Sequence, residues 1–204
     1  MPAKKKEEPK QLVEFPSIFR VVAADLSLRR PGFAKFLVTR RDNVYYLSHI
    51  EMTNLDNKGD CKKKAPEILC EISRLMSSFY PTSPFMCPVF PVRERGLDVV
   101  STSAKTIETL SKVVGINDAF VWNRYHMLSY EIPPFTVKRL ITGNYKAPKE
   151  QVAECLYSYV GEQNYACDDE SDALAVGISF MIQNGAYPQF KDIPKDKVKI
   201  CLPE

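Results

Sequence analysis

Acidic side chains occur at two points of the sequence where they could bind metal ions together. Asp25 directly follows an apolar run at residues 18–24, and four acids occupy five positions at residues 168–172. An acid at the carboxyl end of a buried strand lies where open α/β sheets place their ligands. Carboxylates that repel one another are stabilised by cations, and their oxygens are the ligands that hard divalent ions prefer.

The second group of acids begins a helix that we expect over residues 169–182. Acids in the first turn of a helix interact favourably with its dipole, by about 0.3–1 kcal/mol each, so one or two would need no further explanation. Four acids in five positions also repel one another. Asp169 and Asp172 are three residues apart and therefore share a face of the helix, so we expect them to bind one cation.

Two candidate ligands have a simpler interpretation when each is considered alone. Asp25 could stabilise a local turn together with Ser27. Glu94 could be a solvated loop residue that pairs with Arg93 or Arg95. Only convergence of the acids on one point would separate a metal site from these local roles.

The elements expected around the acids form an α/β fold with a mixed five-stranded sheet flanked by helices. Alternating or continuous apolar patterns predict strands at residues 18–25, 33–40, 44–50, 85–90 and 127–132. Apolar residues at helical spacing predict helices at residues 66–79, 101–124, 148–160 and 169–182. A turn at residues 41–43 and a loop at residues 54–64 complete the expected outline.

The chain of 204 residues suits one domain with extensions. We expect a disordered charged tail at residues 1–16, one globular domain at residues 17–186 and a surface extension at residues 187–204. No apolar run is long enough to span a bilayer or to act as a signal peptide. Six cysteines without paired spacing and two histidines argue against zinc and favour reduced thiols in the cytoplasm.

Basic residues recur along the chain, although the net charge is only +3. Clusters of this kind usually belong to solvated faces, and their recurrence moderately favours a phosphate-binding surface. The candidates for contact with DNA are Arg29, Arg30, Lys62, Lys63 and Lys64.

Together these segments resemble the RuvC family of Holliday junction resolvases, which belongs to the ribonuclease H-like superfamily. Asp25 matches the aspartate that ends the first strand of the family, and Glu94 matches the acid that follows its fourth strand. Residues 169–175, Asp-Glu-Ser-Asp-Ala-Leu-Ala, match the Asp-x-x-Asp-Ala-Leu-Ala pattern of the final helix. Two lysine-bearing blocks, which contain Lys138 and Lys149, precede it in the expected order. The chain departs from the family where Leu26-Ser27 replaces a small residue and glycine.

The resemblance implies a metal-dependent endonuclease that resolves branched DNA and leaves 5′-phosphate ends. Two Mg²⁺ ions, which Mn²⁺ could replace, would be bound by Asp25, Glu94, Asp169 and Asp172. Lys149 would stabilise charge on the phosphate, and Lys138 would bind DNA nearby. Paired cuts further imply a C2 homodimer, with the helix at residues 107–121 as its interface. A resolvase of this type would be cytoplasmic and nucleoid-associated, in a bacterium or phage.

Two other functions fit the same sequence. A ribonuclease H-like nuclease could act on another substrate such as an RNA–DNA hybrid, and a non-catalytic nucleic-acid-binding protein could use the same fold. An actin-like or sugar-kinase ATPase fits less well, because it needs glycine-rich phosphate loops and a duplicated domain, and this chain has eight glycines.

Overall fold

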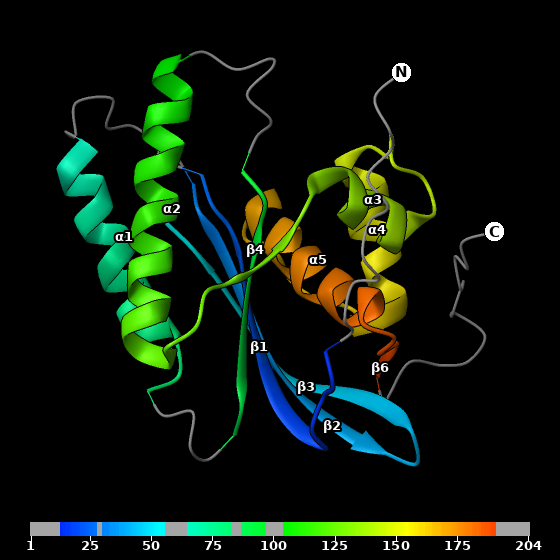
Figure 1. The fold of residues 1–204 in the computed structure, drawn as a ribbon. Helices are drawn as coiled ribbons and strands as arrows, with labels where there is room; N and C mark the ends of the chain where they lie inside the picture. Colours follow the sequence, from blue (N-terminus) through cyan, green and yellow to red (C-terminus); the bar gives the residue numbers. More distant parts are fainter. Residues whose placement is uncertain (1–12, 28–29, 56–64, 83–86, 97–103, 191–204) are drawn as a thin grey trace, which may run out of the picture.

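The computed structural model describes residues 13–27, 30–55, 65–82, 87–96 and 104–190. Within these residues one mixed sheet has the strand order β5-β4-β1-β2-β3-β6, with helices on both faces (Figure 1). The strands are β1 (Ile18–Asp25), β2 (Gly32–Arg41), β3 (Val44–Asn54), β4 (Val89–Glu94), β5 (Tyr130–Ile132) and β6 (Pro188–Phe190). The helices are α1 (Ala65–Phe79), α2 (Ala104–Tyr125), α3 (Pro134–Thr142), α4 (Lys149–Val160) and α5 (Asp168–Gln183). None of these helices is long and apolar enough to cross a membrane.

Strand β1 lies in the middle of the sheet because nearly all of its side chains are apolar. Phe19 and the four residues from Val21 to Ala24 are fully buried. β1 pairs antiparallel with β2 and parallel with β4. Since β1 and β4 run in the same direction, their carboxyl ends, at Asp25 and Glu94, meet at one edge of the sheet.

Two hydrophobic layers cover the two faces of the sheet. Helices α1 and α2 pack on one face, against Val22, Ala24 and Phe33. Helix α5 packs on the other face and is itself covered by α3 and α4 (Figure 1). Because α5 is enclosed on both sides, all ten residues from Ala173 to Ile182 are buried. The first turn of α5 points to the edge of the sheet at which β1 ends.

The expected α/β architecture is confirmed, but the sheet has six strands among the described residues rather than five. The additional strand is β6, whose residues Pro188–Phe190 pair in parallel with β3. We expected this segment to lie over the surface because it contains proline. An edge strand tolerates proline at its first residue, since no neighbour there requires its missing N–H.

Strand β4 begins later than the sequence pattern indicated. The pattern placed it at residues 85–90, whereas it spans Val89–Glu94 and contains Pro91. Arg93 appeared to belong to a loop because it is charged, yet it is only 6% exposed. Ion pairs with Asp118 and Glu131 explain its burial. Glu94 is therefore the last residue of a strand and not a loop residue.

Helix α3 is an addition to the elements that the sequence pattern predicts, because the two prolines at residues 133–134 indicate the end of the preceding strand. Pro134 is instead the first residue of the helix, where its missing N–H costs nothing. Gly143 ends the helix with a left-handed φ of 76°. The strand that precedes it is shorter than expected and spans only Tyr130–Ile132.

Candidate active site

Three aspartates that are distant in the sequence meet at the carboxyl end of β1. Asp25, Asp169 and Asp172 each offer a carboxylate oxygen, and these oxygens all lie within 4.8 Å of one another. Asp25 is the last residue of β1, and the other two lie in the first turns of α5. The sheet and the helix thus bring together the acids that the sequence singled out.

The beginning of α5 lies directly against β2. A Cβ atom added to Gly32 would stand 2.0 Å from the backbone oxygen of Asp169. No side chain fits at that distance, so glycine at this position allows Asp169 to approach β1. The sequence pattern did not indicate this role, because an isolated glycine at the start of a strand normally means only a turn.

Glu170 attaches the same turn of α5 to β3. It is only 5% exposed, and its Oε1 accepts a hydrogen bond of 2.8 Å from Nδ2 of Asn54. Its Oε2 accepts a second one, also of 2.8 Å, from the backbone N–H of Ala166. Glu170 is thus an anchor for the helix, unlike its neighbours Asp169 and Asp172. Its place as the third helical residue, where glutamate often reaches back to a free N–H, was the signal in the sequence.

Asp25 faces the acids of α5. Burial, together with the charges of Asp172 and Asp169, raises its pKa from 3.8 to about 7. Among the described residues after β1, Ser27 stabilises the turn, because its Oγ accepts a 2.9 Å hydrogen bond from the backbone N–H of Arg30. The position of Asp25 therefore favours a role shared with the acids of α5.

Glu94 lies beside the three aspartates, although it is not part of the group within 4.8 Å. Burial, together with the charges of Asp25 and Asp172, raises its pKa from 4.5 to about 8. Lys149 and Lys138 act in the opposite direction, so both lysines are close enough to influence it. The neighbouring arginines, Arg93 and Arg95, pair with Glu131 rather than with Glu94.

Lys149 is the cation closest to this group of acids within the described part of the chain. Its Nζ forms a short hydrogen bond and ion pair with Oδ2 of Asp172. Partial burial acts to lower the pKa of Lys149, but this hydrogen bond and the charges of Asp172, Asp25 and Asp169 raise it overall. Lys149 therefore carries its positive charge at the site, where it balances only part of the negative charge.

Two of the predicted DNA-binding residues are described. Lys138 lies on α3, near enough to Glu94 to lower its pKa. Arg30 follows the turn after β1, whereas Arg29, Lys62, Lys63 and Lys64 lie outside the described residues. Asp168, the first residue of α5, is exposed. Among the described residues, the lysines of α3 and α4 thus belong to the same region as the acids.

The donor set suits a hard divalent cation. All its ligand atoms are carboxylate oxygens, and the group contains neither histidine nor cysteine. Oxygen ligands favour Mg²⁺ or Mn²⁺ over zinc. The raised pKa values of Asp25 and Glu94 show that negative charge at this point is destabilised, so a cation would relieve it.

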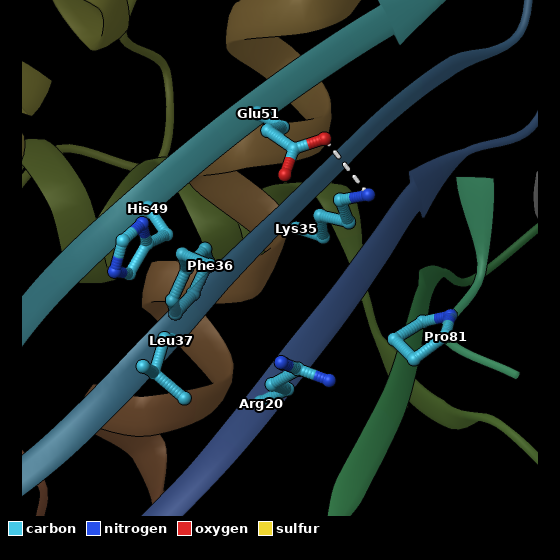
Figure 2. A pocket seen from close by; sticks show the side chains of 7 residues that line it. All are labelled: Arg20, Lys35, Phe36, Leu37, His49, Glu51 and Pro81. Atoms are coloured by element: carbon cyan, nitrogen blue, oxygen red, sulfur yellow. Dashed lines mark ion pairs between the residues drawn. The ribbon is translucent and has the colours of Figure 1, made fainter. Parts of the chain in front are cut away.

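A pocket elsewhere on the sheet has a different character. It has a volume of about 360 Å³ and is lined by residues that include Arg20, Lys35 and His49 (Figure 2). Its one carboxylate, Glu51, pairs with Lys35 at 2.8 Å. Arg20 lies five residues before Asp25, toward the opposite end of β1. This pocket therefore offers no second acidic centre.

Comparisons with known proteins agree with this geometry. No family model matches the chain. The crossover junction endodeoxyribonuclease RuvC of Wolbachia sp. subsp. Brugia malayi (strain TRS) is 24% identical over 168 residues, which cover 82% of this chain and 97% of that protein. The RuvC structure of Thermus thermophilus matches 84% of this chain and 100% of its own, with 17% identity and a TM-score of 0.57. Its structure in complex with a Holliday junction substrate matches with a TM-score of 0.56. The resemblance to RuvC is thus confirmed in sequence, and the fold is that of RuvC.

Proposed function

We propose that this protein is a metal-dependent endonuclease that resolves four-way DNA junctions by paired phosphodiester hydrolysis and leaves 5′-phosphate ends. The observation that carries the proposal is the meeting of Asp25, Asp169 and Asp172, with Glu94 beside them. A site that had lost its function would have no reason to keep four carboxylates in a costly arrangement. The likeness to RuvC, in sequence over most of the chain and in fold, supports the choice of substrate.

The four acids would hold two Mg²⁺ ions, which Mn²⁺ could replace. Such ions generate a nucleophile from water and stabilise the leaving oxygen of a phosphodiester. Asp25 and Glu94 bind in their deprotonated forms and must lose the protons that burial favours. Asp172 orients the ammonium of Lys149 toward the same point.

The lysines provide the positive charge that a phosphate needs. Lys149 stabilises negative charge that develops on the scissile phosphate, as preorganised donors do in other enzymes. Lys138, on α3, binds a neighbouring phosphate of the same strand. The basic residues Arg29, Arg30 and Lys62 to Lys64 provide further contacts with DNA. Their binding weakens steeply as salt concentration rises, because phosphate contacts release counterions.

Symmetric cleavage of a junction requires two active sites, which a C2 homodimer provides. We assign the interface to α2, around residues 107–121. Trp122, in the last turn of α2, is 52% exposed, and Leu128, in the loop after the helix, is 63% exposed; both favour a contact there. Aromatic residues of this size are enriched in protein interfaces.

A cleavage assay with three substrates tests the proposal. A four-way junction, an RNA–DNA hybrid duplex and a linear DNA duplex are each incubated with Mg²⁺, with Mn²⁺ and with EDTA. We expect paired cuts in the junction with either metal and no cuts with EDTA. Preferential cleavage of the hybrid would favour a ribonuclease H instead. Tight junction binding without cleavage under any metal condition would favour a non-catalytic binding protein.

A further inference from the structure

A buried arginine lies next to Glu94 in strand β4. Arg93 is 6% exposed, and its guanidinium contacts carboxylates from two other elements. Its Nη2 donates to Oε1 of Glu131 in β5 at 2.6 Å. Its Nε and Nη2 donate to the two carboxylate oxygens of Asp118 in α2, at 3.2 and 3.3 Å. Arg93 thus connects β4 to both the neighbouring strand and the covering helix.

The same side chain also reaches the backbone of Glu94. Nη1 of Arg93 lies 3.5 Å from the carbonyl oxygen of Glu94. Neighbouring residues of a strand point to opposite faces, so Arg93 faces α2 while Glu94 faces the aspartates. The arginine can therefore fix the end of β4 from behind without occupying the metal site.

Further hydrogen bonds hold the partners of Arg93 in place. Asn117 is fully buried, and its Nδ2 donates to Oδ1 of Asp118 at 3.2 Å and to Oγ of Ser129 at 3.0 Å. Tyr80 donates its hydroxyl to Oδ1 of Asn117 at 3.3 Å. Asp118 is consequently oriented by residues that precede β5 and follow α1, which makes it a rigid partner for Arg93.

The end of β4 needs this support because its outer neighbour is short. β5 has three residues, and its pairing with β4 ends at Glu94 opposite Ile132. Just beyond, the backbone N–H of Arg95 donates to the carbonyl of Ile132 at 2.8 Å. The side-chain Nε of Arg95 lies 3.9 Å from Oε2 of Glu131. Arginines anchored to β5 therefore flank Glu94 on both sides.

Stability alone gives a poor reason for this arrangement. The side chain of Arg93 is buried whereas those of Asp118 and Glu131 are 30% and 44% exposed. Desolvation of the guanidinium offsets much of its attraction to these acids, and an apolar residue of similar size is often as stable. What the guanidinium provides is a planar set of donors with fixed directions. From this geometry we infer that Arg93 is a positioning residue, which fixes Glu94 at the metal site through Asp118 and Glu131; the inference rests on the proposed function.

The test compares metal binding by Arg93→Met and Arg93→Lys with that of the wild-type protein. Binding of Mn²⁺ without DNA is measured by electron paramagnetic resonance, and the Mg²⁺ concentration that gives half-maximal junction cleavage is measured separately. Loss of residues that orient metal ligands typically weakens binding by about 10- to 100-fold, and we expect Arg93→Met to fall in this range. Arg93→Lys keeps the positive charge but loses the planar set of donors, so we expect an intermediate effect.

The matched control removes an exposed arginine contact at the other end of the sheet. Nη2 of Arg40, near the end of β2, donates to Oδ1 of Asn43 at 2.6 Å, and Arg40 is exposed. We expect Arg40→Met to leave both metal measurements unchanged. A purely structural role of Arg93 would lower the melting temperature of Arg93→Met and leave the metal affinity of its folded fraction unchanged.

Unchanged metal affinity of folded Arg93→Met would overturn the inference. If Arg93→Met does not fold, Glu131→Gln decides the question, because it weakens the 2.6 Å contact and leaves Asp118 in place. Weaker Mn²⁺ binding by Glu131→Gln supports the positioning role, and wild-type affinity contradicts it. If the wild-type protein itself binds no Mn²⁺, the proposed function fails and this inference fails with it. If the wild-type protein binds Mn²⁺ and the Arg93 and Glu131 variants bind it equally well, this inference alone is overturned.

Discussion

At the scale of single residues, the site is defined by carboxylates that resist ionisation. Burial and the charges of nearby acids together raise the pKa of Asp25 to about 7 and that of Glu94 to about 8. Lys149 offsets part of this effect through its pairing with Asp172. In the metal-free protein, both acids therefore retain protons at pH values where ordinary carboxylates have lost them.

These raised pKa values make the stability of the metal-free protein depend on pH. The ordinary pKa values of Asp25 and Glu94 are 3.8 and 4.5, so above these values the unfolded chain loses protons that the folded protein keeps. The free energy of unfolding must then decrease as pH rises from about 4 to about 8.

Metal binding offsets this decrease in the free energy of unfolding, because the metal binds the deprotonated acids. We expect Mg²⁺ to raise the melting temperature more at about pH 8.5 than at about pH 6. Thermal unfolding followed by circular dichroism, with sodium chloride of equal ionic strength as the control, measures both shifts. An equal or smaller Mg²⁺ effect at the higher pH would contradict the assignment of these two acids to the metal site.

Substitution of one ligand separates catalysis from binding. Asp169→Asn keeps the size of the side chain but removes its charge, so we expect junction cleavage with Mg²⁺ to be abolished. Junction binding should be retained, because phosphate contacts to basic residues dominate affinity. The exposed neighbour Asp168 provides the control, and Asp168→Asn should cleave like the wild-type protein. Cleavage by Asp169→Asn would mean that the site has been assigned wrongly.

At the scale of elements, the approach of α5 to the sheet decides whether the acids meet. Gly32 and Gly177 both allow this approach, since a Cβ atom at Gly177 would stand 2.8 Å from the ring of Phe36. Glu170 adds a hydrogen bond from the first turn of α5 to Asn54 at the end of β3. The position of Asp169 therefore depends on contacts that themselves carry no catalytic group.

Gly32→Ala tests the dependence on this contact. The added methyl group would meet the backbone oxygen of Asp169 at 2.0 Å, so α5 must shift away from β2. A displacement of about 1 Å at a catalytic group can cost about a hundredfold in rate, and we expect a loss of this order in junction cleavage. Ser77→Ala on α1 is the control, because the exposed hydroxyl of Ser77 donates to the carbonyl of Ser73 in the same helix and lies outside the proposed interface. That change should leave cleavage unchanged. Equal cleavage by both variants would show that the contact is unimportant.

The sequence predicted those elements whose pattern is local. The apolar run before Asp25 indicated a buried strand, and the helical spacing of apolar residues after Asp172 indicated α5. Acids at the ends of such elements could be recognised as candidates for one site. The assignment of Asp25, Glu94, Asp169 and Asp172 as metal ligands remains a prediction, although the structure brings them into one region.

Features that depend on long-range contacts could not be predicted. Arg93 is charged and yet buried, because Asp118 and Glu131 lie 25 and 38 residues further along the chain. This is why the sequence pattern ended β4 too early and placed Glu94 in a loop. The role of Gly32 likewise depends on Asp169, which is remote in sequence. Strand β6 gains its stability from pairing with β3, which no local propensity reveals.

At the scale of the whole molecule, the account requires two copies of the chain. One active site cuts one strand, so resolution of a junction needs a second site related by symmetry. We expect size-exclusion chromatography with light scattering to give twice the chain mass of 23.2 kDa at micromolar concentration. A clean monomer would contradict the proposed mode of cleavage.

An interface variant locates the contact. Trp122→Glu places a charge on an exposed aromatic position of α2 and should shift the protein toward monomer. Tyr187→Glu changes a similarly exposed aromatic residue beside β6 and should remain dimeric. Dissociation by the second variant and not by the first would move the interface from α2 to the β6 edge of the sheet.

The account depends most directly on the acids of β1, β4 and α5 binding metal ions together. Crystals soaked in Mn²⁺ and measured near the manganese absorption edge locate such ions by their anomalous scattering. The account predicts two peaks, enclosed by carboxylate oxygens of Asp25, Glu94, Asp169 and Asp172, which disappear in the Asp169→Asn variant. Manganese bound elsewhere, with these acids left without an ion, would contradict it.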